Sequence, residues 1–549
     1  MSKASRKVMF SLMTFLLAGS TLTGCSGNNG NNGNNGDKEA TTSSNTSAEQ
    51  TAVTYPITTD KSLTYWGALP NNLTGVKSAH AEVPFYQEWQ KQTGINIKFT
   101  TPPANQVDES FNVMLASGEL PDLLEYNFFN FPGGPEKAIK DGYILELNDL
   151  IDKYAPNYKK YLQEHPEIEK MVKTDNGSYY SFPFIRVDET QLTFQGPVIR
   201  KDWLDELGLP VPETIDEWTT TLKAFKEKKG ATAAISFVGK PRVFNELGNG
   251  AFIGAYGVTR DFYLEDGKVK FGPAEPGYKD FLNLFRQWYA DGLLDKDVAT
   301  VDSKVMDANI TSGATGATWA NSGGGIGKWT PILKGIDAKA SIVATPYPVL
   351  EKGTTPKFGQ RDYAYSTGGM VAISATSKNA ELAVKLLDYG YSEEGQRLFN
   401  FGIEGVSYTM ENGSPKFTDL IMNNPDKLAP AQAMSLYIRG NTGGPFISDK
   451  RVSEQYLNLP EQQEAVTIWK KTDMANYQLP LVTPTPEESA EFANIMADVN
   501  TLVDEMTLKI ILGTEPLDAY DKYLEKLNSV KLSRAIEIKQ AALERYLKR

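Results

Sequence analysis

The sequence predicts an α/β fold divided into two lobes, with a helical C-terminus. Strand-like and helix-like segments alternate from about residue 60, which is typical of parallel βαβ units. The folded part holds roughly 490 of the 549 residues, too many for one hydrophobic core, so we expect at least two α/β units. Amphipathic patterns near the end of the chain predict helices packed on one of these units.

Residues 1–24 have the composition of a secretory signal. Three positive residues precede an apolar run at 8–18, which is too short to span a membrane as a mature helix. The tetrapeptide LTGC at 22–25 resembles a bacterial lipobox, which implies cleavage before Cys25 and attachment of lipid to its sulfur. The alternative is a free thiol in the remnant of an ordinary signal peptide. Cys25 is the only cysteine, so an intrachain disulfide is excluded.

The segment after Cys25 has the composition of a flexible tether. Three Gly-Asn-Asn units occupy residues 27–36, and a stretch rich in Thr, Ser, Ala and Glu continues to about Asp60. Such a coil of ~30 residues has an r.m.s. reach of about 30 Å. We therefore assign residues 25–59 to a lipidated cysteine and a disordered tether.

The mature protein is acidic. The formal net charge is −12, and removing residues 1–24, which hold three positive and no negative side chains, shifts it to about −15. An excess of negative charge argues against nucleic acid as a partner and against a basic membrane-binding patch. The expected contact with a membrane is through the lipid anchor only.

The first predicted βαβ units lie at the start of the folded part. Strand patterns at 62–67, 94–100 and 121–127 are separated by helical patterns. In parallel sheets, ligands bind at the carboxyl ends of the strands. We therefore expect Trp66, which comes at the end of the first strand, and the loop at 127–130 to lie on one rim.

A second run of elements begins near Phe194. Thr214 and Glu217 form a predicted capping box, in which each side chain satisfies a backbone amide at the start of a helix, and Gly230 marks the end of that helix. Further along, the segment at 310–325 is rich in glycine, alanine and threonine and is predicted to be a strand.

The last 65 residues are predicted to be helical. Residues 485–488, Thr-Pro-Glu-Glu, form a second predicted capping box with proline at the first helical position. Apolar residues then recur at three- and four-residue steps from Phe492 to Ile510, and Gly513 marks the end. We interpret this apolar face as core and not as a binding groove.

Five segments carry a resemblance to a known family. They are ASGELPDLLEY, VIRKDWLDELGLPVPETIDEW, WYADGLLDKD, FGIEGVSYTM and ILGTEPLDAYDKYLEKL. These segments resemble recurrent parts of the family 1 extracellular solute-binding lipoproteins, the substrate-capture components of carbohydrate ABC importers. The match is best with the large branch associated with complex-oligosaccharide uptake, and it covers the chain from about residue 60 to the end.

The resemblance implies a monomer with the two-lobe periplasmic-binding-protein-like fold and a hinge of several crossover segments. Such a protein closes on its oligosaccharide and docks on the permease subunits of an ABC transporter, held by lipid at the extracellular face of the bacterial cytoplasmic membrane. By resemblance, the first lobe comprises residues 60–190 and 355–410. The second lobe comprises residues 191–354 and 411–549.

The sequence gives little support to enzymatic or metal chemistry. Only His80 and His165 occur, so a zinc HExxH motif and a multi-histidine metal site are absent. No nucleophile elbow, Walker A loop or complete Gly-x-Gly-x-x-Gly occurs either. The segment at 173–180 lacks the alternating oxygen ligands of an EF-hand and is predicted to be a hairpin turn. We therefore expect no cofactor, no metal and no catalytic residue.

Three other functions stay open at this stage. A secreted glycoside hydrolase needs only two carboxylates, and the 68 acidic residues allow many pairs. A peptide-binding transport lipoprotein is a variant of the same two-lobe design. A purely structural surface lipoprotein would lack a cleft of ligand size.

Candidate binding residues follow from the chemistry of sugars. One face of a pyranose is relatively apolar and packs on aromatic rings, whereas the hydroxyls bond to planar Asn, Asp, Glu and Arg side chains. Aromatic residues in small or polar loops are therefore favoured, with burial in the core as the alternative for each. The candidates are Trp66, Asn127, Phe128, Trp319, Asn321, Trp329, Arg361, Tyr363 and Tyr365.

The charge of the ligand stays open. Arg186, Arg242, Arg361 and Arg439 lie near predicted turns and could pair with uronate carboxylates, although solvation at the surface is the favoured interpretation. The sequence therefore does not choose between neutral and uronate-containing oligosaccharides.

Overall fold

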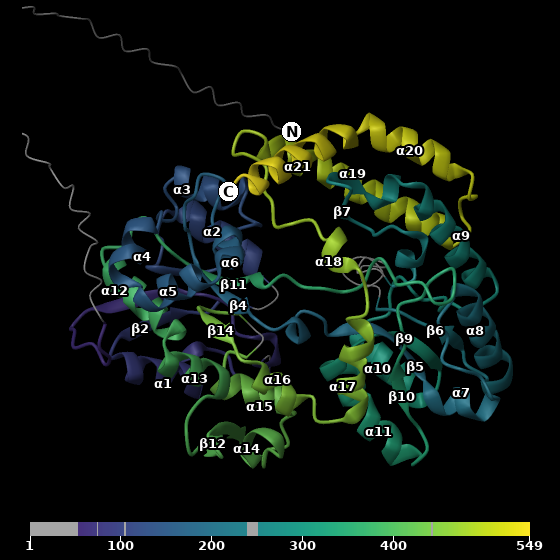
Figure 1. Cartoon of the computed structure of the whole chain (residues 1–549), viewed down its shortest axis with the longest axis horizontal. Helices are drawn as coiled ribbons and strands as arrows, with labels where there is room; N and C mark the ends of the chain where they lie inside the picture. Colours follow the sequence, from purple (N-terminus) through teal and green to yellow (C-terminus); the bar gives the residue numbers. More distant parts are fainter. Residues whose placement is uncertain (1–52, 74, 104–105, 239–250, 441–442) are drawn as a thin grey trace, which may run out of the picture. The chain divides into compact units, whose positions relative to one another are not determined.

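The structure of the protein is a computed structural model that describes residues 53–73, 75–103, 106–238, 251–440 and 443–549. The signal, Cys25 and most of the predicted tether lie outside these residues. The described chain contains two large β-sheets, each with its own helices and hydrophobic core (Figure 1). The predicted α/β fold of two lobes is therefore confirmed.

The first lobe is built on a six-stranded sheet of order β14-β4-β11-β3-β1-β2. The parallel pairing of β1 with both β2 and β3 confirms the predicted βαβ units, whereas β11 runs antiparallel between β3 and β4. The strands are β1 (Ser62–Trp66), β2 (Asn96–Thr100), β3 (Leu123–Glu125), β4 (Phe182–Arg186), β11 (Tyr365–Ile373) and β14 (Phe446–Ser448). The helices that share their core are α1 (Pro84–Thr93), α2 (Val107–Ser117), α3 (Gly134–Lys140), α4 (Asn148–Tyr154), α5 (Pro156–Glu164), α6 (Pro166–Val172), α12 (Ala380–Asp388) and α13 (Glu393–Phe401).

The second lobe is built on a four-stranded sheet of order β10-β5-β9-β6. Its strands are β5 (Gln195–Arg200), β6 (Ala233–Ile235), β9 (Thr315–Asn321) and β10 (Ile342–Ala344), with a separate hairpin of β7 (Phe262–Glu265) and β8 (Lys268–Phe271). The helices of its core are α7 (Lys201–Leu207), α8 (Ile215–Lys229), α9 (Pro276–Ala290), α10 (Ser303–Ser312), α11 (Lys328–Ile336), α17 (Pro460–Trp469), α19 (Ser489–Ile511), α20 (Ala519–Ser529) and α21 (Leu532–Leu547). The short helix α18 (Met474–Tyr477) follows α17.

A small third core is attached to the first lobe. It is formed by the hairpin of β12 (Tyr408–Glu411) and β13 (Ser414–Phe417) with α14 (Asp419–Met422), α15 (Pro430–Tyr437) and α16 (Lys450–Tyr456). Helix α15 packs against α1 and against the segment after β1, so this core extends the first lobe beside its sheet.

The chain passes between the two large sheets several times. Residues 187–194 join β4 to β5, and residues 345–364 join β10 to β11. A third crossing at 449–459, which includes α16, leads from β14 to α17. The hinge implied by the family resemblance is thus present as several crossover segments.

Strand β14 differs from the expected division of the chain, in which residues 411–549 belonged to the second lobe. β14 pairs in parallel with β4 of the first sheet, and the ring of Phe446 lies 4.7 Å from Phe184 and 5.1 Å from Phe399. The chain therefore stays with the first lobe through β14 and leaves it only in the third crossing. A strand of three residues is too short for its periodicity to reveal it.

Only one of the two predicted capping boxes stands at the start of a helix. Glu217 N donates to Thr214 Oγ1 and Thr214 N donates to Glu217 Oε2, both at 3.2 Å, which confirms the start of α8. The equivalent bonds of Thr485 and Glu488 have lengths of 3.3 and 3.4 Å, yet α19 begins only at Ser489. The second box therefore closes a turn just before the helix.

The small-residue segment at 310–325 is only partly a strand. Helix α10 ends at Ser312, β9 covers Thr315–Asn321, and Ser322–Gly327 form a π-helical turn. The small residues allow side chains from neighbouring helices to approach the sheet: a Cβ on Gly316 would lie 2.4 Å from Cδ2 of Phe225. Small size here serves close packing and does not leave the strand uncovered.

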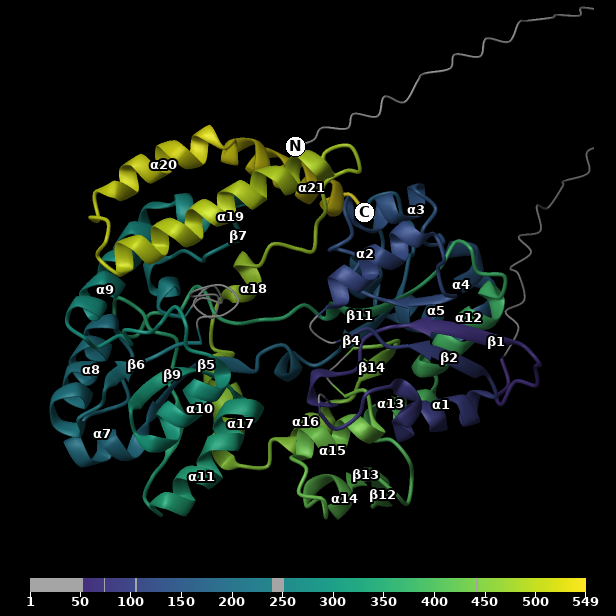
Figure 2. The same cartoon turned by 180° about the vertical axis from the view of Figure 1, so that it is seen from behind.

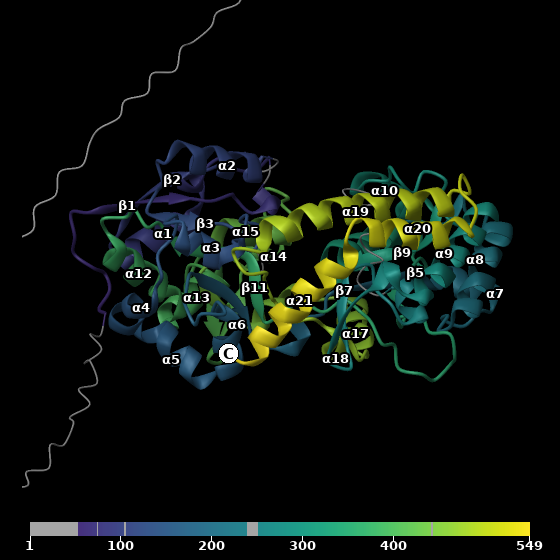
Figure 3. The same ribbon diagram turned by 90° about the horizontal axis from the view of Figure 1, so that it is seen from above.

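The C-terminal helix α21 contacts both lobes. Figure 2 and Figure 3 show α19, α20 and α21 together at the end of the chain. Leu532 belongs to the core of the second lobe, whereas Arg545 and Arg549 pair with Asp175 of the first lobe at 2.7 and 2.6 Å. Asp175 lies in the segment at 173–180, whose antiparallel bridge between residues 173 and 179 confirms the predicted hairpin turn.

Asp388, at the end of α12, holds the start of α5. Its side chain is fully buried and accepts hydrogen bonds from Tyr158 N at 2.8 Å, from Asn157 Nδ2 at 2.7 Å and from Asn157 N at 3.3 Å. These bonds satisfy amide groups that have no partner within the first turn of α5. Burial raises the pKa of Asp388 to about 6.

We expect Asp388→Ala to lower the free energy of unfolding by about 2–3 kcal/mol, because it leaves buried N–H groups without an acceptor. Asp388→Asn keeps one acceptor oxygen and should lose about half as much. Urea denaturation followed by circular dichroism at pH 7 measures both. Equal losses in the two variants would contradict the role given to the carboxylate oxygens.

Candidate ligand-binding site

The carboxyl ends of five strands lie at one edge of the first sheet. All of its strands except β11 run in the same direction, since β11 is antiparallel to both β3 and β4. The segments after β1 and β3 leave the sheet at this edge. In open α/β sheets, ligands bind in the crevice beyond the carboxyl ends of the strands.

A cavity of about 470 Å³ lies at this edge, and we call it the edge pocket. Its volume is within the usual range of small-molecule sites. The walls come from the segment after β1, the start of α2, the end of β3, the middle of β11 and the residues after α15. The polar residues that line it are Asn71, Asn72, Asp108, Glu125, Tyr126, Asn127, Asn130 and Arg439.

A buried ion pair forms one wall of the edge pocket. Arg439 pairs with Glu125 through Nη2 and donates from Nε to the Gly443 carbonyl at 2.8 Å. The hydroxyl of Tyr86 accepts from Nη1 of Arg439, and Tyr65 donates to Glu125 Oε2 at 2.6 Å. Both charged side chains are less than one-tenth exposed. Burial has the largest single effect and opposes the charge of Arg439, but Glu125, Tyr86 and Tyr65 together outweigh it, so the pKa of Arg439 is raised and the guanidinium stays protonated.

Glycines allow the segment after α15 to approach β11. Gly369 has φ +72°, and a Cβ there would lie 2.9 Å from Gly443 Cα and 3.0 Å from Glu125 Oε1. Gly443 itself has φ +110°, and the Gly444 amide donates to the Gly369 carbonyl at 2.8 Å. The pairing of β11 shifts register at this position, between Ser366 and Val371. A bulge with glycine at positive φ thus brings Arg439 to Glu125.

Four asparagines supply most of the remaining polar groups of the edge pocket. Asn71, Asn72 and Asn130 are exposed and Asn127 is half-buried. Asn127 uses its Oδ1 to accept from Phe129 N at 3.1 Å. Each carboxamide both donates and accepts hydrogen bonds, as does each hydroxyl of a sugar. The pocket is therefore suited to a ligand rich in hydroxyl groups.

A second cavity, of about 240 Å³, lies at the carboxyl end of β9, and we call it the hinge pocket. Asn321, which ends β9, lines it together with Arg186 at the end of β4, Gln191 of the first crossover and Tyr456 of the third. Asn321 pairs with Gln195 at the start of β5, directly after residues 187–194. The carboxyl ends of β4 and β9 therefore flank the same crossover segment.

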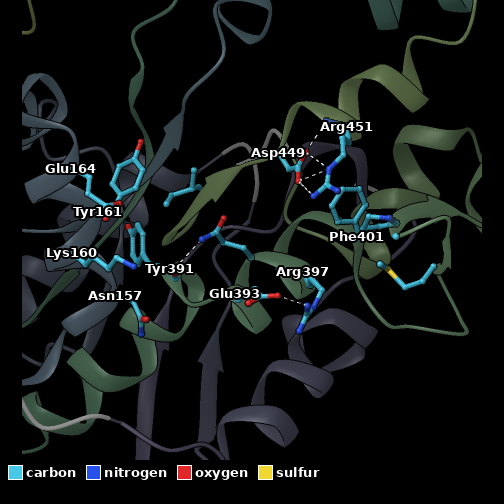
Figure 4. A pocket seen from close by; sticks show the side chains of 15 residues that line it. Asn157, Lys160, Tyr161, Glu164, Tyr391, Glu393, Arg397, Phe401, Asp449 and Arg451 are labelled. Atoms are coloured by element: carbon cyan, nitrogen blue, oxygen red, sulfur yellow. Dashed lines mark hydrogen bonds and ion pairs between the residues drawn. The ribbon is translucent and has the colours of Figure 1, made fainter.

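The largest of the cavities described, about 590 Å³, lies beside β14, the edge strand of the sheet on the side opposite β2. One wall comes from α5 and carries Tyr161, and the other carries Arg397 and Arg451 (Figure 4). Arg451 is held by both oxygens of Asp449, and Arg397 pairs with a glutamate on its own helix. Because its two arginines are already paired with acidic residues and it lies away from the ends of the central strands, we do not assign the ligand to it.

The candidate residues from the sequence are divided among these cavities and the cores. Asn127 lines the edge pocket and Asn321 lines the hinge pocket. Arg361 and Tyr363 line another cavity of about 370 Å³, where Arg361 donates to Gln478 and Glu189, and Tyr363 donates to the Leu479 carbonyl. The structure therefore does not bring these candidates together in one site.

The five other candidates are buried in the cores, which corrects the expectation that their rings are accessible. Trp66, Trp319 and Trp329 are each 4% exposed, and Phe128 and Tyr365 are fully buried. Trp66 packs on the ring of Phe111 in α2 and on that of Tyr126, which follows β3, while Trp329 Nε1 donates to an aspartate of α10 at 2.8 Å. Small residues beside these rings in the sequence allow other side chains to cover them. Small neighbours therefore do not indicate that a ring is exposed.

The sequence missed the central pair of the site. Surface solvation was the favoured interpretation for Arg439, but it is buried against Glu125. Glu125 did carry a usable signal. It is the acidic last residue of the short strand Leu123–Glu125, where an unpaired buried charge would be costly, so a positively charged partner could have been expected. No local signal identified Arg439 as its partner, because the two residues are 314 positions apart.

The chain was compared with known proteins. A family model described as bacterial extracellular solute-binding protein matches residues 76–397. The fructooligosaccharide ABC transporter substrate-binding protein FusA of Streptococcus pneumoniae is 26% identical, over 90% of this chain and 92% of its own length. Lipoprotein LipO of Bacillus subtilis is 27% identical over 78% of this chain and 84% of its own. A crystal structure of the alginate-binding protein AlgQ2 superposes with a TM-score of 0.73 at 26% identity, covering 88% of this chain and 99% of that one.

His80 packs against Tyr86, whose hydroxyl accepts a hydrogen bond from Arg439. Its ring is fully buried, stacks on Phe99 at 5.0 Å and meets Tyr86 at 4.6 Å. Nδ1 lies 2.7 Å from Thr101 Oγ1. Burial, with a smaller contribution from the positive charge of Arg439, lowers the pKa of His80 to about 3. The imidazole is therefore neutral in the folded protein at pH 5, whereas it is protonated in the unfolded chain.

We expect acid to destabilise the protein through His80. The unfolded chain takes up the proton below about pH 6.5 and the folded protein only near pH 3, so stability falls as the pH falls through this range, by about 2 kcal/mol between pH 7 and pH 5. Asp388 titrates in the same range with the opposite sign, since its pKa is raised. The measurement is therefore the difference in unfolding free energy between wild type and His80→Gln at each pH.

His165 provides the matched control, because its side chain is 39% exposed. The His165→Gln variant should follow the wild-type pH profile, whereas His80→Gln should lose less stability than wild type between pH 7 and pH 5. Parallel profiles for wild type and His80→Gln would show that His80 is not the group responsible.

Proposed function

Because the chain belongs to the bacterial extracellular solute-binding protein family, we propose that it captures an oligosaccharide in the edge pocket and delivers it to an ABC permease. The family model matches more than half of the chain, and the relative FusA is named as the substrate-binding protein of an ABC transporter. The chain is accordingly a binding protein and not an enzyme. The observation that carries the proposed site is the edge pocket itself, with four carboxamides at the carboxyl ends of the central strands.

The proposed binding mode uses both lobes. Asn127 of the edge pocket and Asn321 at the end of β9 are our proposed ligand contacts in the first and second lobe. Support comes from the topology, since β4 and β9 both end at the crossover 187–194. A ligand that contacts both lobes binds the closed form better than the open form, which is the requirement for ligand-driven closure. A ligand held by one lobe alone would not draw the lobes together.

The pair of carboxylates in the edge pocket does not support the glycoside hydrolase alternative. Hydrolysis requires one carboxyl group that holds a proton to donate to the leaving oxygen. Glu125 is ion-paired with Arg439 and accepts a hydrogen bond from Tyr65, and Asp108 accepts one from Tyr126 at 2.9 Å. Each carboxylate is therefore already used as a hydrogen-bond acceptor within the protein.

We further propose that the protein is tethered to the extracellular face of the cytoplasmic membrane through Cys25. The support is the lipobox-like tetrapeptide at 22–25, the flexible composition that follows it, and the relative LipO, which is named as a lipoprotein. In the described part of the chain, no helix is long and apolar enough to cross a membrane. The monomeric state expected from the family resemblance belongs to the same proposal.

Oligosaccharide binding is tested by isothermal titration of the mature chain carrying Cys25→Ser, against neutral and uronate-containing oligosaccharides. The double variant Asn127→Ala/Asn130→Ala removes two carboxamides, and we expect it to weaken binding by about tenfold or more, since each lost hydrogen bond contributes roughly 1 kcal/mol. Asn528→Ala, on the exposed face of α20, should bind as wild type does.

The possible outcomes of this titration separate the alternatives. Absence of binding to every sugar would contradict the proposed function. Normal binding by the double variant would move the site away from the edge pocket. Recovery of cleaved sugar, detected by chromatography after the titration, would favour a hydrolase.

The lipid anchor is tested by cell fractionation. Wild-type protein expressed in its own cells should sediment with membranes, whereas the Cys25→Ser variant should appear in the medium, because the attached acyl chains are its only proposed membrane contact. Thermal denaturation should give the same midpoint for both purified proteins. Membrane association that persists in the variant would contradict the anchor.

A further inference from the structure

We propose that the edge pocket selects neutral oligosaccharides and rejects those whose sugars carry a carboxylate. The inference rests on the proposed function and names the ligand class of the same pocket. It follows from the charged side chains that face the pocket and from the ion pairs and hydrogen bonds that each of them already makes within the protein. The sequence alone left this choice open.

The described lining of the edge pocket carries two negative side chains and one positive side chain. Asp108 and Glu125 are the negative ones and Arg439 is the positive one. Because Glu125 and Arg439 form an ion pair, the charge that is left over belongs to Asp108 and is negative. A uronate entering the pocket would therefore give up its hydration and meet a carboxylate without gaining a cation.

Arg439 is not available to bind a carboxylate ligand. Recognition of a uronate by arginine needs two parallel N–H groups directed at its two oxygens. Nε of Arg439 is directed at the Gly443 carbonyl, Nη1 at Tyr86 and Nη2 at Glu125. The side chain is 4% exposed. Turning it toward a ligand would leave the buried carboxylate of Glu125 without its partner, which is strongly unfavourable.

The start of α2 does not supply a positive site either. A helix N-terminus attracts anions through its free N–H groups and its dipole. In α2 the first turn already carries Asp108 and Glu109, which offset that partial charge. Asp108 also accepts a hydrogen bond from the Tyr126 hydroxyl, which keeps its carboxylate at the pocket. This end of the helix therefore repels a second carboxylate.

The other arginines that could have met a uronate are also paired. Arg186, in the hinge pocket, donates to Asp362 at 2.7 Å. Arg361 pairs with Glu189 at 2.9 Å and lines a different cavity. Arg242, the remaining arginine singled out from the sequence, lies outside the described residues.

The uncharged groups of the pocket favour hydroxyl ligands. Asn71, Asn72, Asn127 and Asn130 each offer acceptor and donor groups, although Asn127 Oδ1 also accepts from Phe129 N and Asn72 Nδ2 also donates to Ser435 Oγ at 3.4 Å. A sugar hydroxyl can match either kind of group, whereas a carboxylate can only accept. The relatives do not decide the question, because FusA is named for fructooligosaccharides and AlgQ2 for alginate.

The test compares sugars that differ only in the carboxylate. The mature chain carrying Cys25→Ser is titrated with neutral oligosaccharides and with uronate oligosaccharides of equal length and linkage, for example β-linked mannan against β-linked mannuronan fragments. Fructo- and gluco-oligosaccharides extend the neutral set. We expect at least one neutral oligosaccharide to bind, and every uronate oligosaccharide to bind at least a hundredfold more weakly than the neutral ligand.

Two controls identify the cause of the rejection. Methyl esterification of the uronate removes its charge. For a sugar whose neutral analogue binds, the methyl ester should bind at least tenfold more tightly than the free uronate. Asp108→Asn should narrow the ratio of affinities between a neutral sugar and its uronate counterpart by a similar factor. Asp518→Asn, in a turn before α20, should leave this ratio unchanged.

Each outcome bears on the inference. Tighter binding of a uronate than of any neutral sugar would overturn it while leaving the proposed function intact. An unchanged ratio in Asp108→Asn would overturn the role of that carboxylate. Failure of both classes to bind would overturn the proposed function and this inference together.

Discussion

The buried pair of Arg439 and Glu125 is the interaction on which the edge pocket depends. Two charges removed from water are tolerated only when their hydrogen-bonding groups are satisfied, and here Tyr65, Tyr86 and the Gly443 carbonyl complete the set. The pair fastens the segment after α15 to the end of β3, across 314 positions of sequence. The pocket at the edge of the first sheet is the consequence.

The same pair links the construction of the pocket to its chemistry. Because the guanidinium is used to hold the wall, the groups that the described lining leaves for a ligand are carboxamides and one carboxylate, that of Asp108. Among these residues many groups can match hydroxyls, but none is a free counterion for an acidic sugar. In our proposal, the packing of the wall and the choice of ligand therefore follow from one contact.

Local signals in the sequence predicted the parts of the fold that local interactions determine. The capping box of Thr214 and Glu217, the parallel strands of the first lobe and the hairpin turn at 173–180 agree with the structure. The burial of Trp319 and the pairing of Arg439 depend on side chains brought from distant segments, and no local pattern encodes them. Strand β14 was missed for the same reason, since its three residues are identified as a strand only by their pairing with β4.

The most direct measurement is a crystal structure of the protein with the tightest-binding oligosaccharide from the titrations. We predict a neutral sugar in the edge pocket, with its hydroxyls within hydrogen-bonding distance of Asn127 and Asn130, and with Arg439 still paired with Glu125. A ligand bound in the cavity beside β14, or a carboxylate held by Arg439 in place of Glu125, would contradict the proposed site and its preference for neutral sugars.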